Sequence, residues 1–448
     1  MYGRASRAAT MIEMAATGEP SIATDRGPQT SGAAPRRLLV CTPFPPRLDA
    51  RHGGRATAQI LARLAERHEV ALLSLRSPTD GPVDRVFTER CDYVEEIPVE
   101  TSTIAPASWS RRARWGIGLL RGLPPWASDC RSPRYAERLR ALAEGWRPDL
   151  VEFHLQVMAQ YASALEEFPA RRVLVDYDPP SAWAAELAER TGGIRRWARR
   201  VELAVWRRYE RATRRRFDAI VVFAERDVPA VASTAGDVPI VRIPLAIEIP
   251  VEPLDPLGQA PPVVLFVGGF GHPPNVDAAR WLARSIFPRV LQRVPDARLE
   301  LVGDRPGEDV RRLAGEAVSV HGSVPDVTPY LDRAAVVTAP IRLGGSMRGK
   351  VLEALGGGKA LVATPRAAEG VEATPDEHFV LATTEDEFVD ALTSLLSDPG
   401  RRRALASSAR AWAVESLAIE RSVRGFERLY DSLSSPGAAG AGVPRTTA

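Results

Sequence analysis

The sequence is poor in cysteine and contains no long apolar run. Its three cysteines, Cys41, Cys91 and Cys130, have neither a disulfide pattern nor metal-ligand spacing, which favours a reducing cytoplasm. No stretch of about 18 apolar residues occurs, so we expect no transmembrane helix. Residues 1–35 lack the apolar core of a secretory signal, and we expect them and residues 435–448 to be disordered tails.

Lysine is nearly absent as well. Only two of the 59 basic residues are lysines, Lys350 and Lys359, and both lie in the glycine-rich stretch IRLGGSMRGKVLEALGGGKALVAT. Positive charge is instead concentrated as arginine. Residues 195–216 hold ten arginines and two glutamates, a local charge of +8 in a chain whose formal net charge is only +3.

This arginine-rich segment predicts an amphipathic helix, because apolar residues recur at helical spacing from Ile194 to Tyr209. In the simplest interpretation its arginine face is solvated. The alternative is a patch that meets anionic lipid headgroups or a phosphorylated substrate. Nucleic acid is a less favoured partner, because no recognisable nucleic-acid-binding module accompanies the patch.

A second segment, 109–130, mixes Trp109, Trp115 and Trp126 with arginines. Core packing or a lid is one interpretation of this segment. The other is an interfacial segment that meets a membrane carrying a lipid-linked acceptor. The chain would then be cytoplasmic and peripheral at the inner face of the membrane.

Most of the chain alternates short apolar runs with amphipathic segments, and 448 residues are too many for one ordinary core. The alternation predicts parallel sheets with helices on both faces, in two domains. Amphipathic helices such as 55–68 and 276–294 separate the strands. The expected strands are 36–42, 69–75, 149–154, 171–177 and 217–223 in the first half, and 262–268, 298–303, 317–322, 334–340 and 360–365 in the second.

A proline-rich segment between the two halves predicts the domain boundary. We expect a first doubly wound domain over 36–245, a linker over 246–261 and a second domain over 262–414. A further helix over 415–434 can cross back to the first domain. Two such domains leave a cleft, and the carboxyl ends of their strands are the usual place for ligand loops.

Glycine-rich loops follow three of the predicted strands. Gly53 and Gly54 open the first helix, where backbone N–H groups bind anions; a flexible turn is the alternative. Gly268 and Gly269 precede a helix for which Asn275 is a good N-cap.

The second of these loops departs from the dinucleotide-binding pattern G-x-G-x-x-G. Gly269 and Gly271 match its first two glycines, but Pro274 occupies the third place. Proline lacks an N–H group and prevents the close packing of helix on strand that glycine allows. NAD binding is therefore disfavoured.

The third loop consists of Gly344, Gly345, Ser346 and Met347. Arg348 and Lys350 follow near the start of a predicted helix. Positive charges are unfavourable there because the helix macrodipole is positive at that end, so we expect an anion such as a diphosphate to neutralise them. Glu353 would accept hydrogen bonds from sugar hydroxyls; a surface pair with Lys350 is the alternative. Lys359 is interpreted as a charge at the C-terminus of the helix.

Taken together, these segments resemble the retaining glycosyltransferases of the GT-B fold, often called glycosyl transferases group 1. The resemblance spans about 36 to 434, and it is strongest over 262–370, where VGGFGHPPN, IRLGGSMRGKVLEAL and AAEG occur in order. It implies an α/β fold of two Rossmann-like doubly wound domains facing a cleft. It also implies a nucleotide-sugar donor bound mainly by the second domain and an acceptor bound mainly by the first.

One motif of that family is incomplete here. Glu353 matches the second glutamate of the family's E-x7-E motif, which usually holds the ribose hydroxyls, whereas Gly345 stands in the place of the first. The pattern resembles a subgroup with GG-x-x-R-x-K, in which Arg348 and Lys350 supply the phosphate charges. His154 resembles a family histidine near the sugar, and a structural role is its alternative.

The resemblance implies transfer of a sugar from a UDP- or GDP-sugar to a hydroxyl of a glycan, a lipid-linked or a small-molecule acceptor, with retention. Arg348, Lys350 and the N–H groups of 344–347 would stabilise the departing diphosphate. A sugar-nucleotide epimerase and a non-catalytic nucleotide-sugar-binding subunit are the alternatives. The triplet Asp176-Tyr177-Asp178 matches D-x-D, a metal-binding motif of a different glycosyltransferase fold, but it is short, and we expect no cofactor and no essential metal.

Overall fold

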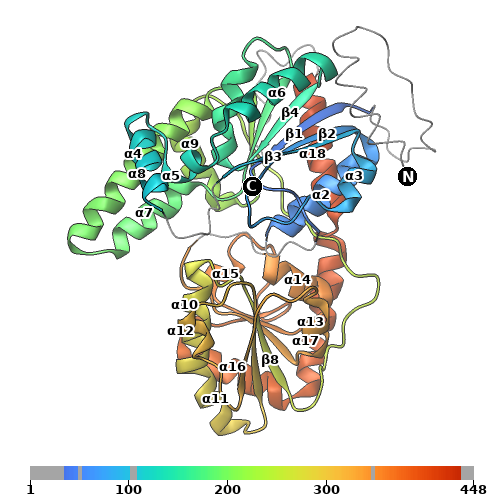
Figure 1. Cartoon of the computed structure of the whole chain (residues 1–448). Helices are drawn as coiled ribbons and strands as arrows, with labels where there is room; N and C mark the ends of the chain where they lie inside the picture. The colour runs from blue at the N-terminus through green and yellow to red at the C-terminus, as the bar shows by residue number, and fades with distance from the viewer. Residues whose placement is uncertain (1–34, 49–52, 101–107, 345–348, 435–448) are drawn as a thin grey trace.

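The computed structural model describes residues 35–48, 53–100, 108–344 and 349–434, which form two α/β domains stacked on each other (Figure 1). Both sheets are parallel throughout. The first has the strand order β3-β2-β1-β4-β5-β6-β7 and the second β10-β9-β8-β11-β12-β13. The central strands of both are buried along nearly their whole length, as in sheets covered by helices on both faces.

The strands of the first sheet are β1 (Arg37–Thr42), β2 (Glu69–Arg76), β3 (Tyr93–Pro98), β4 (Leu150–His154), β5 (Arg171–Asp176), β6 (Ala219–Val222) and β7 (Ile240–Arg242). Those of the second are β8 (Val263–Val267), β9 (Arg298–Val302), β10 (Val318–His321), β11 (Val336–Ala339), β12 (Leu361–Ala363) and β13 (Val380–Leu381). All ten strands expected from the apolar runs are confirmed. Three further strands were not expected: β3, which has two glutamates at its centre, and the edge strands β7 and β13, which are three and two residues long.

The helices of the first domain are α2 (Gly53–Arg67), α3 (Arg85–Arg90), α4 (Trp109–Leu120), α5 (Pro125–Asp129), α6 (Pro133–Trp146), α7 (Pro180–Arg190), α8 (Gly193–Arg214) and α9 (Val228–Ala235). A 3₁₀ segment, Gln156–Leu165, follows β4. Helices α4, α5, α7 and α8 gather at one side of this domain, and α7 and α8 project from it as a pair (Figure 1). None of the helices in the described ranges combines the length and apolar character needed to cross a bilayer.

The helices of the second domain are α10 (Pro273–Trp281), α11 (Phe287–Arg293), α12 (Glu308–Arg311), α13 (Thr328–Arg333), α14 (Gly349–Gly357), α15 (Pro365–Ala368), α16 (Glu385–Ser397) and α17 (Pro399–Ser416). The helix expected over 276–294 is divided into α10, a π-helical turn at Leu282–Ile286, and α11. Pro288 accounts for the interruption, because proline cannot donate the backbone hydrogen bond that a continuous α-helix needs there.

The last helix, α18 (Ile419–Ser434), lies against the first domain rather than the second. Arg67 of α2 forms an ion pair with Glu427 at 3.3 Å, and the Tyr430 hydroxyl donates to Glu152 of β4 at 2.5 Å. The chain thus crosses between the domains twice, once near 246–261 and once at the α17–α18 junction. Two crossings restrict how the domains can move relative to each other.

Lys359 has a structural position that the sequence analysis did not predict. Its side chain is fully buried, and its ammonium donates to the backbone carbonyl oxygens of Asp255 in the interdomain segment and, at 2.9 Å, Asp332 in α13. The interpretation of Lys359 as a simple helix C-terminal charge is therefore wrong. The residue fastens the interdomain segment to the second domain.

Burial of Lys359 gives a testable dependence of stability on pH. Burial lowers the pKa of Lys359 from 10.5 to about 8. Between pH 8 and 10.5 the unfolded chain still binds this proton and the folded chain does not, so the free energy of unfolding rises with pH relative to a Lys359→Met variant. The expected change is on the order of 2–3 kcal/mol. Urea unfolding at pH 7.5 and pH 10 checks it, and parallel pH profiles for the two proteins would contradict it.

Candidate functional site

The two domains meet where the first domain's α7 approaches the loops that follow β8 and β11. The indole of Trp183 lies 6.2 Å from the His272 ring, centroid to centroid. Glu186 forms an ion pair with Arg366 at 2.6 Å and accepts a hydrogen bond from the Gly344 N–H at 3.4 Å. The carboxyl ends of the second sheet therefore face the first domain, as expected for ligand loops in a parallel sheet.

Lys350 is held at this edge by the side-chain amide of Asn275. Its ammonium donates to Oδ1 of Asn275 at 2.7 Å, and Nδ2 of Asn275 donates to the carbonyl of Gly269 at 2.9 Å. The Lys350 ammonium also lies 5.4 Å from the centroid of the Phe266 ring. A Cβ at position 268 would come within 2.9 Å of the Asn275 side chain, so glycine is required there. The structure thus brings together Gly268, Gly269, Asn275 and Lys350.

The prediction that Asn275 caps its helix is wrong. α10 begins at Pro273 with His272 at the N-cap, which places Asn275 within the first turn. Two prolines fit the first turn because its N–H groups have no partner inside the helix. Asn275 is therefore free to be buried and to orient Lys350 instead of closing the helix end.

His272 and Glu353 lie near this ammonium. The cleft partly desolvates His272, and Lys350 adds to the effect, so the pKa of the imidazole falls to about 4 although part of the residue is exposed. Glu353 is half-buried one turn after Lys350 in α14. Burial raises the pKa of the Glu353 carboxyl, while Arg55 of the first domain and Lys350 oppose the rise. Arg55 and Glu353 thus face each other across the two domains.

The loop before α14 is described only in part. Gly345, Ser346, Met347 and Arg348 lie outside the described residues. Gly344 has a φ of 75°, a left-handed conformation that favours glycine. A Cβ there would lie 2.9 Å from Pro274 and 3.0 Å from Trp183. Glycine at 344 is therefore required both by the backbone conformation and by the close approach of α7.

On the first domain, His154 ends β4 inside a chain of buried hydrogen bonds. Its Nε2 lies 3.0 Å from Glu152 and its Nδ1 lies 2.5 Å from the Tyr177 hydroxyl. Burial raises the pKa of Tyr177 above its ordinary value, so the phenol keeps its proton and donates to Nδ1. Nε2 then donates to Glu152, which also accepts from Tyr430 of α18. The imidazole is thereby fixed in one orientation.

A small pocket opens beside this chain at the carboxyl end of β1. It is lined by Phe44, Gly54 and Thr57, together with His154 and Tyr177. α2 begins at Gly53, so the first glycine pair does open the helix that borders this pocket. The structure thus separates the predicted residues into two groups, one with Lys350 on the second domain and one with His154 on the first.

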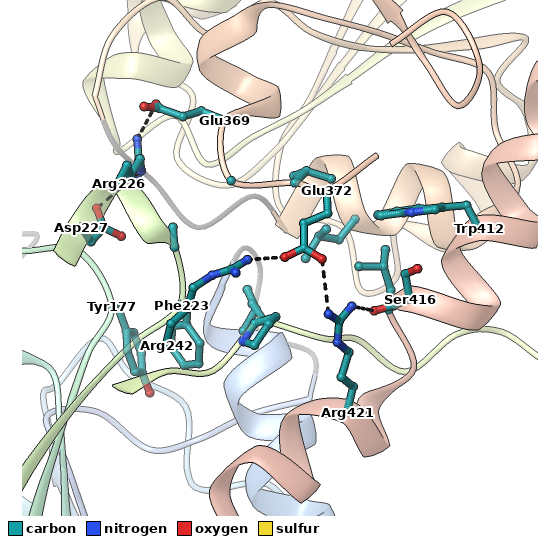
Figure 2. Close-up of a pocket in the computed structure, with 17 residues that line it drawn as sticks. Tyr177, Phe223, Arg226, Asp227, Arg242, Glu369, Glu372, Trp412, Ser416 and Arg421 are labelled. Carbon is teal, nitrogen blue, oxygen red and sulfur yellow. Dashed lines mark hydrogen bonds and ion pairs between the residues drawn. The ribbon is translucent and has the colours of Figure 1, made fainter. Parts of the chain in front are cut away.

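A larger pocket, which the sequence analysis missed, lies between the domains at the hinge. Figure 2 shows the Glu372 carboxylate between Arg242 of β7 and Arg421 of α18. The Glu372 oxygens accept from Arg242 at 2.5 Å and from Arg421 at 3.3 Å, and Arg242 lowers the pKa of this carboxyl. Arg226 and Glu369 form a further ion pair between the domains at 2.9 Å. No sequence spacing indicates these pairs, because their members are 49 to 143 residues apart.

The first carboxylate of the D-x-D triplet is held in a buried ion pair. Asp176 accepts from Arg214 at 2.5 Å in a fully buried ion pair, and Arg214 also binds Glu210 at 3.1 Å. Tyr177 points to His154. Across the described ranges, no group of three or more His, Cys, Asp or Glu side chains could hold a metal ion.

Comparison with known proteins places this architecture. Residues 261–398 match the family model described as Glycosyl transferases group 1. Sucrose-phosphate synthase from Thermosynechococcus elongatus superposes with a TM-score of 0.65 at 15% identity, covering 89% of this chain and 99% of that one. HepE of Anabaena in complex with UDP-glucose gives 0.59 at 15% identity, with 88% and 100% covered. Trehalose 6-phosphate synthase from Burkholderia multivorans gives 0.57 at 14% identity, with 89% and 99% covered.

A search of curated protein sequences finds no match. The superpositions and the two parallel sheets show that the chain has the GT-B fold, two Rossmann-like domains facing a cleft, as the resemblance implied. Its second domain matches the glycosyl transferases group 1 family over the residues that hold Asn275, Lys350 and Glu353.

The glycine at 344 supports a prediction about the cleft. Gly344→Ala places a Cβ against Pro274 and Trp183 in a left-handed backbone, so we expect the free energy of unfolding to fall by about 1–3 kcal/mol. Urea unfolding measures the change. Gly322→Ala is the matched control, because nothing lies within 4 Å of its added Cβ and its φ is not left-handed. Equal stability of the two variants would show that α7 does not press on this loop.

Proposed function

We propose that the protein is a retaining glycosyltransferase that moves a sugar from a UDP- or GDP-sugar to an acceptor hydroxyl. One observation carries the proposal. Lys350, at the start of α14, has its ammonium anchored by Asn275, and both residues lie inside the segment that matches the glycosyl transferases group 1 family. The GT-B fold and the placement of this ammonium at the interdomain edge support it.

The departing diphosphate is the charge that such a reaction must stabilise. Lys350 and the N-terminal end of α14 supply positive charge at one place, and a phosphate oxygen there would meet both. Asn275 is assigned as a positioning residue, because its amide oxygen accepts from the Lys350 ammonium while its Nδ2 donates to the Gly269 carbonyl. Arg348, which lies outside the described residues, is assigned the same phosphate-binding role from its place in the sequence.

Glu353 is assigned to the sugar hydroxyls of the nucleotide. It lies one turn further along α14 than Lys350, on the side that faces Arg55 of the first domain. A carboxylate there accepts hydrogen bonds from paired hydroxyls. HepE of Anabaena, which has the same fold, was crystallised with UDP-glucose, and this favours a uridine nucleotide as the first donor to test.

The acceptor is assigned to the first domain, beside His154 and the start of α2. The Tyr177–His154–Glu152 chain presents a rigid wall to the pocket at the end of β1. Domain closure would bring this wall to the donor and exclude water. We propose a front-face route with retention, in which the leaving phosphate accepts the proton of the acceptor hydroxyl. We propose further that neither a cofactor nor a metal takes part and that the reaction occurs in the cytoplasm.

The decisive variant is Lys350→Ala. Removing the ammonium should lower kcat/KM with the preferred donor by about a hundredfold to a thousandfold, because charge on the leaving group is then unbalanced. Lys350→Arg should recover part of the loss, and Asn275→Ala should give a smaller loss that appears mainly in KM. Steady-state release of the nucleoside diphosphate is the measurement. Arg312→Ala, an exposed change at the C-cap of α12, is the control. Turnover of Lys350→Ala within about threefold of wild type would overturn the assignment.

Two other activities are distinguished by their products. A sugar-nucleotide epimerase would use the same cleft and release an altered nucleotide sugar without free UDP. A non-catalytic binding subunit would bind the donor tightly and neither transfer nor hydrolyse it. Nothing in the contacts of Lys350 and Glu353 favours either over transfer.

A further inference from the structure

In the described part of the chain, large apolar side chains that reach solvent are concentrated on two helices. Ten such residues are exposed, and six of them belong to α4 and α8. On α4 these are Trp109, Ile117, Leu119 and Leu120, exposed by 85, 52, 42 and 90%; on α8 they are Trp197 and Val201, exposed by 68 and 40%. A concentration of this kind marks an interaction surface, whereas scattered exposed apolar residues do not.

The orientation of α4 is fixed by its polar side. Arg111 is buried and forms an ion pair with Asp129 of α5 at 2.8 Å, and Nε1 of Trp115 donates to the same carboxylate at 3.0 Å. Gly118 packs closely against Ser128. α4 thus buries an arginine and exposes leucine, isoleucine and tryptophan, the reverse of an ordinary surface helix. These contacts hold the apolar face of α4 outward, and none of the described residues buries it.

The same surface is strongly basic. Residues 109–121 contain four arginines and no acidic residue, and α8 contains eight arginines and two glutamates. These two segments carry a formal charge of +10, whereas the whole chain carries +3, so the remainder sums to −7. Arg195, Arg196 and Arg200 are exposed beside Trp197 and Val201. The guanidinium of Arg112 lies 5.8 Å from the Trp109 ring centroid.

The two helices are neighbours on one side of the first domain. The turn after α4 touches α8, because a Cβ on Gly122 would lie 3.3 Å from Nε of Arg208. Figure 1 shows α4, α5, α7 and α8 grouped at one side of the first domain. We call the exposed residues of α4 and α8 the α4–α8 surface.

This surface is one helix away from the donor loop. α8 packs against α7. α7 in turn carries Glu186, which contacts Arg366 and Gly344, and Trp183, which lies against His272. A partner bound on the α4–α8 surface would therefore lie next to the mouth of the cleft.

We propose that the α4–α8 surface binds a bilayer that contains anionic lipid. Tryptophan and leucine among arginines suit the headgroup boundary, where apolar side chains insert and guanidinium groups bind phosphates. A second copy of the chain would bring two strongly basic surfaces together. A protein partner would require an interface core depleted of charge, which this surface lacks. Building on the proposed function, the acceptor would be a lipid-linked hydroxyl delivered from that bilayer.

The test is co-sedimentation with phosphatidylcholine vesicles that contain either no anionic lipid or about 30 mol % phosphatidylglycerol. The wild-type chain should bind the anionic vesicles, lose binding as salt is raised, and leave the neutral vesicles unbound. An apolar variant, Trp109→Ser with Leu120→Ser, and a charge variant, R195Q/R196Q/R200Q, should each bind about tenfold more weakly or worse.

Matched controls exist elsewhere on the surface. Val414→Ser removes an exposed apolar residue of α17, and R289Q/R293Q/R312Q removes three exposed arginines of the second domain; both should bind like wild type. Transfer to a water-soluble acceptor should be unchanged in the α4–α8 variants. That readout separates failure of the membrane proposal from failure of the proposed function.

Four results would overturn the proposal. The first is absence of binding to anionic vesicles at low salt. The second is equal binding by the α4–α8 variants and the controls. Binding to heparin that depends on the arginines, together with vesicle binding that is indifferent to Trp109 and Leu120, would indicate a general polyanion patch. Self-association in sedimentation velocity that is lost in W109S/L120S would indicate a second copy of the chain.

Discussion

The Lys350–Asn275 hydrogen bond is the constraint on which the donor side of the molecule depends. An ammonium on a flexible stem is a poor recognition group unless its position is fixed. Here the amide of Asn275 is oriented by the Gly269 carbonyl and presents one acceptor to Lys350. Gly268 is small enough to permit that approach. Gly268 and Gly269 of the loop after β8, together with Asn275 of α10, thus determine where a charge on α14 lies.

A fixed charge is useful only if the opposite wall of the cleft is also held. The return of α18 to the first domain and the Arg242–Glu372–Arg421 contacts at the hinge provide this alignment. These ion pairs are partly exposed and contribute little stability individually. Their role is to align the two domains, because they join Glu372 of the second domain to Arg242 of the first domain and to Arg421 of α18. Trp183 and Glu186 complete the contact on the α7 side of the cleft.

Much of the fold could be predicted from the sequence, because buried parallel strands appear in the sequence as continuous apolar runs. The strands 36–42 and 262–268 are clear examples, and of the glycines that follow them Gly54 lines the pocket at the end of β1 and Gly268 packs against Asn275. The short edge strand β7 could not be predicted, since three residues carry no usable period. The pairing of Arg242 with Glu372 depends on tertiary structure that no local spacing encodes.

The errors at the site have physical reasons. Asn275 has the chemistry of an N-cap, but two preceding prolines start the helix earlier and leave the amide for Lys350. Lysine is usually a surface residue, but Lys359 is buried in the core. The backbone carbonyls that bind its ammonium come from segments that are distant in the sequence. An outward-facing segment at α4 is only one of the two interpretations that the sequence allows. Helical periodicity does not reveal the buried Arg111–Asp129 ion pair that fixes the orientation of the helix.

The most direct test of the account is the affinity of the protein for UDP and for uridine, measured by calorimetry on wild type and Lys350→Ala. If Lys350 binds the diphosphate, the substitution should weaken UDP binding by at least about tenfold and leave uridine binding unchanged. Equal losses for both ligands would show that the substitution disturbs the nucleoside site instead. Unchanged affinity for UDP would contradict the claim that Lys350 recognises the diphosphate.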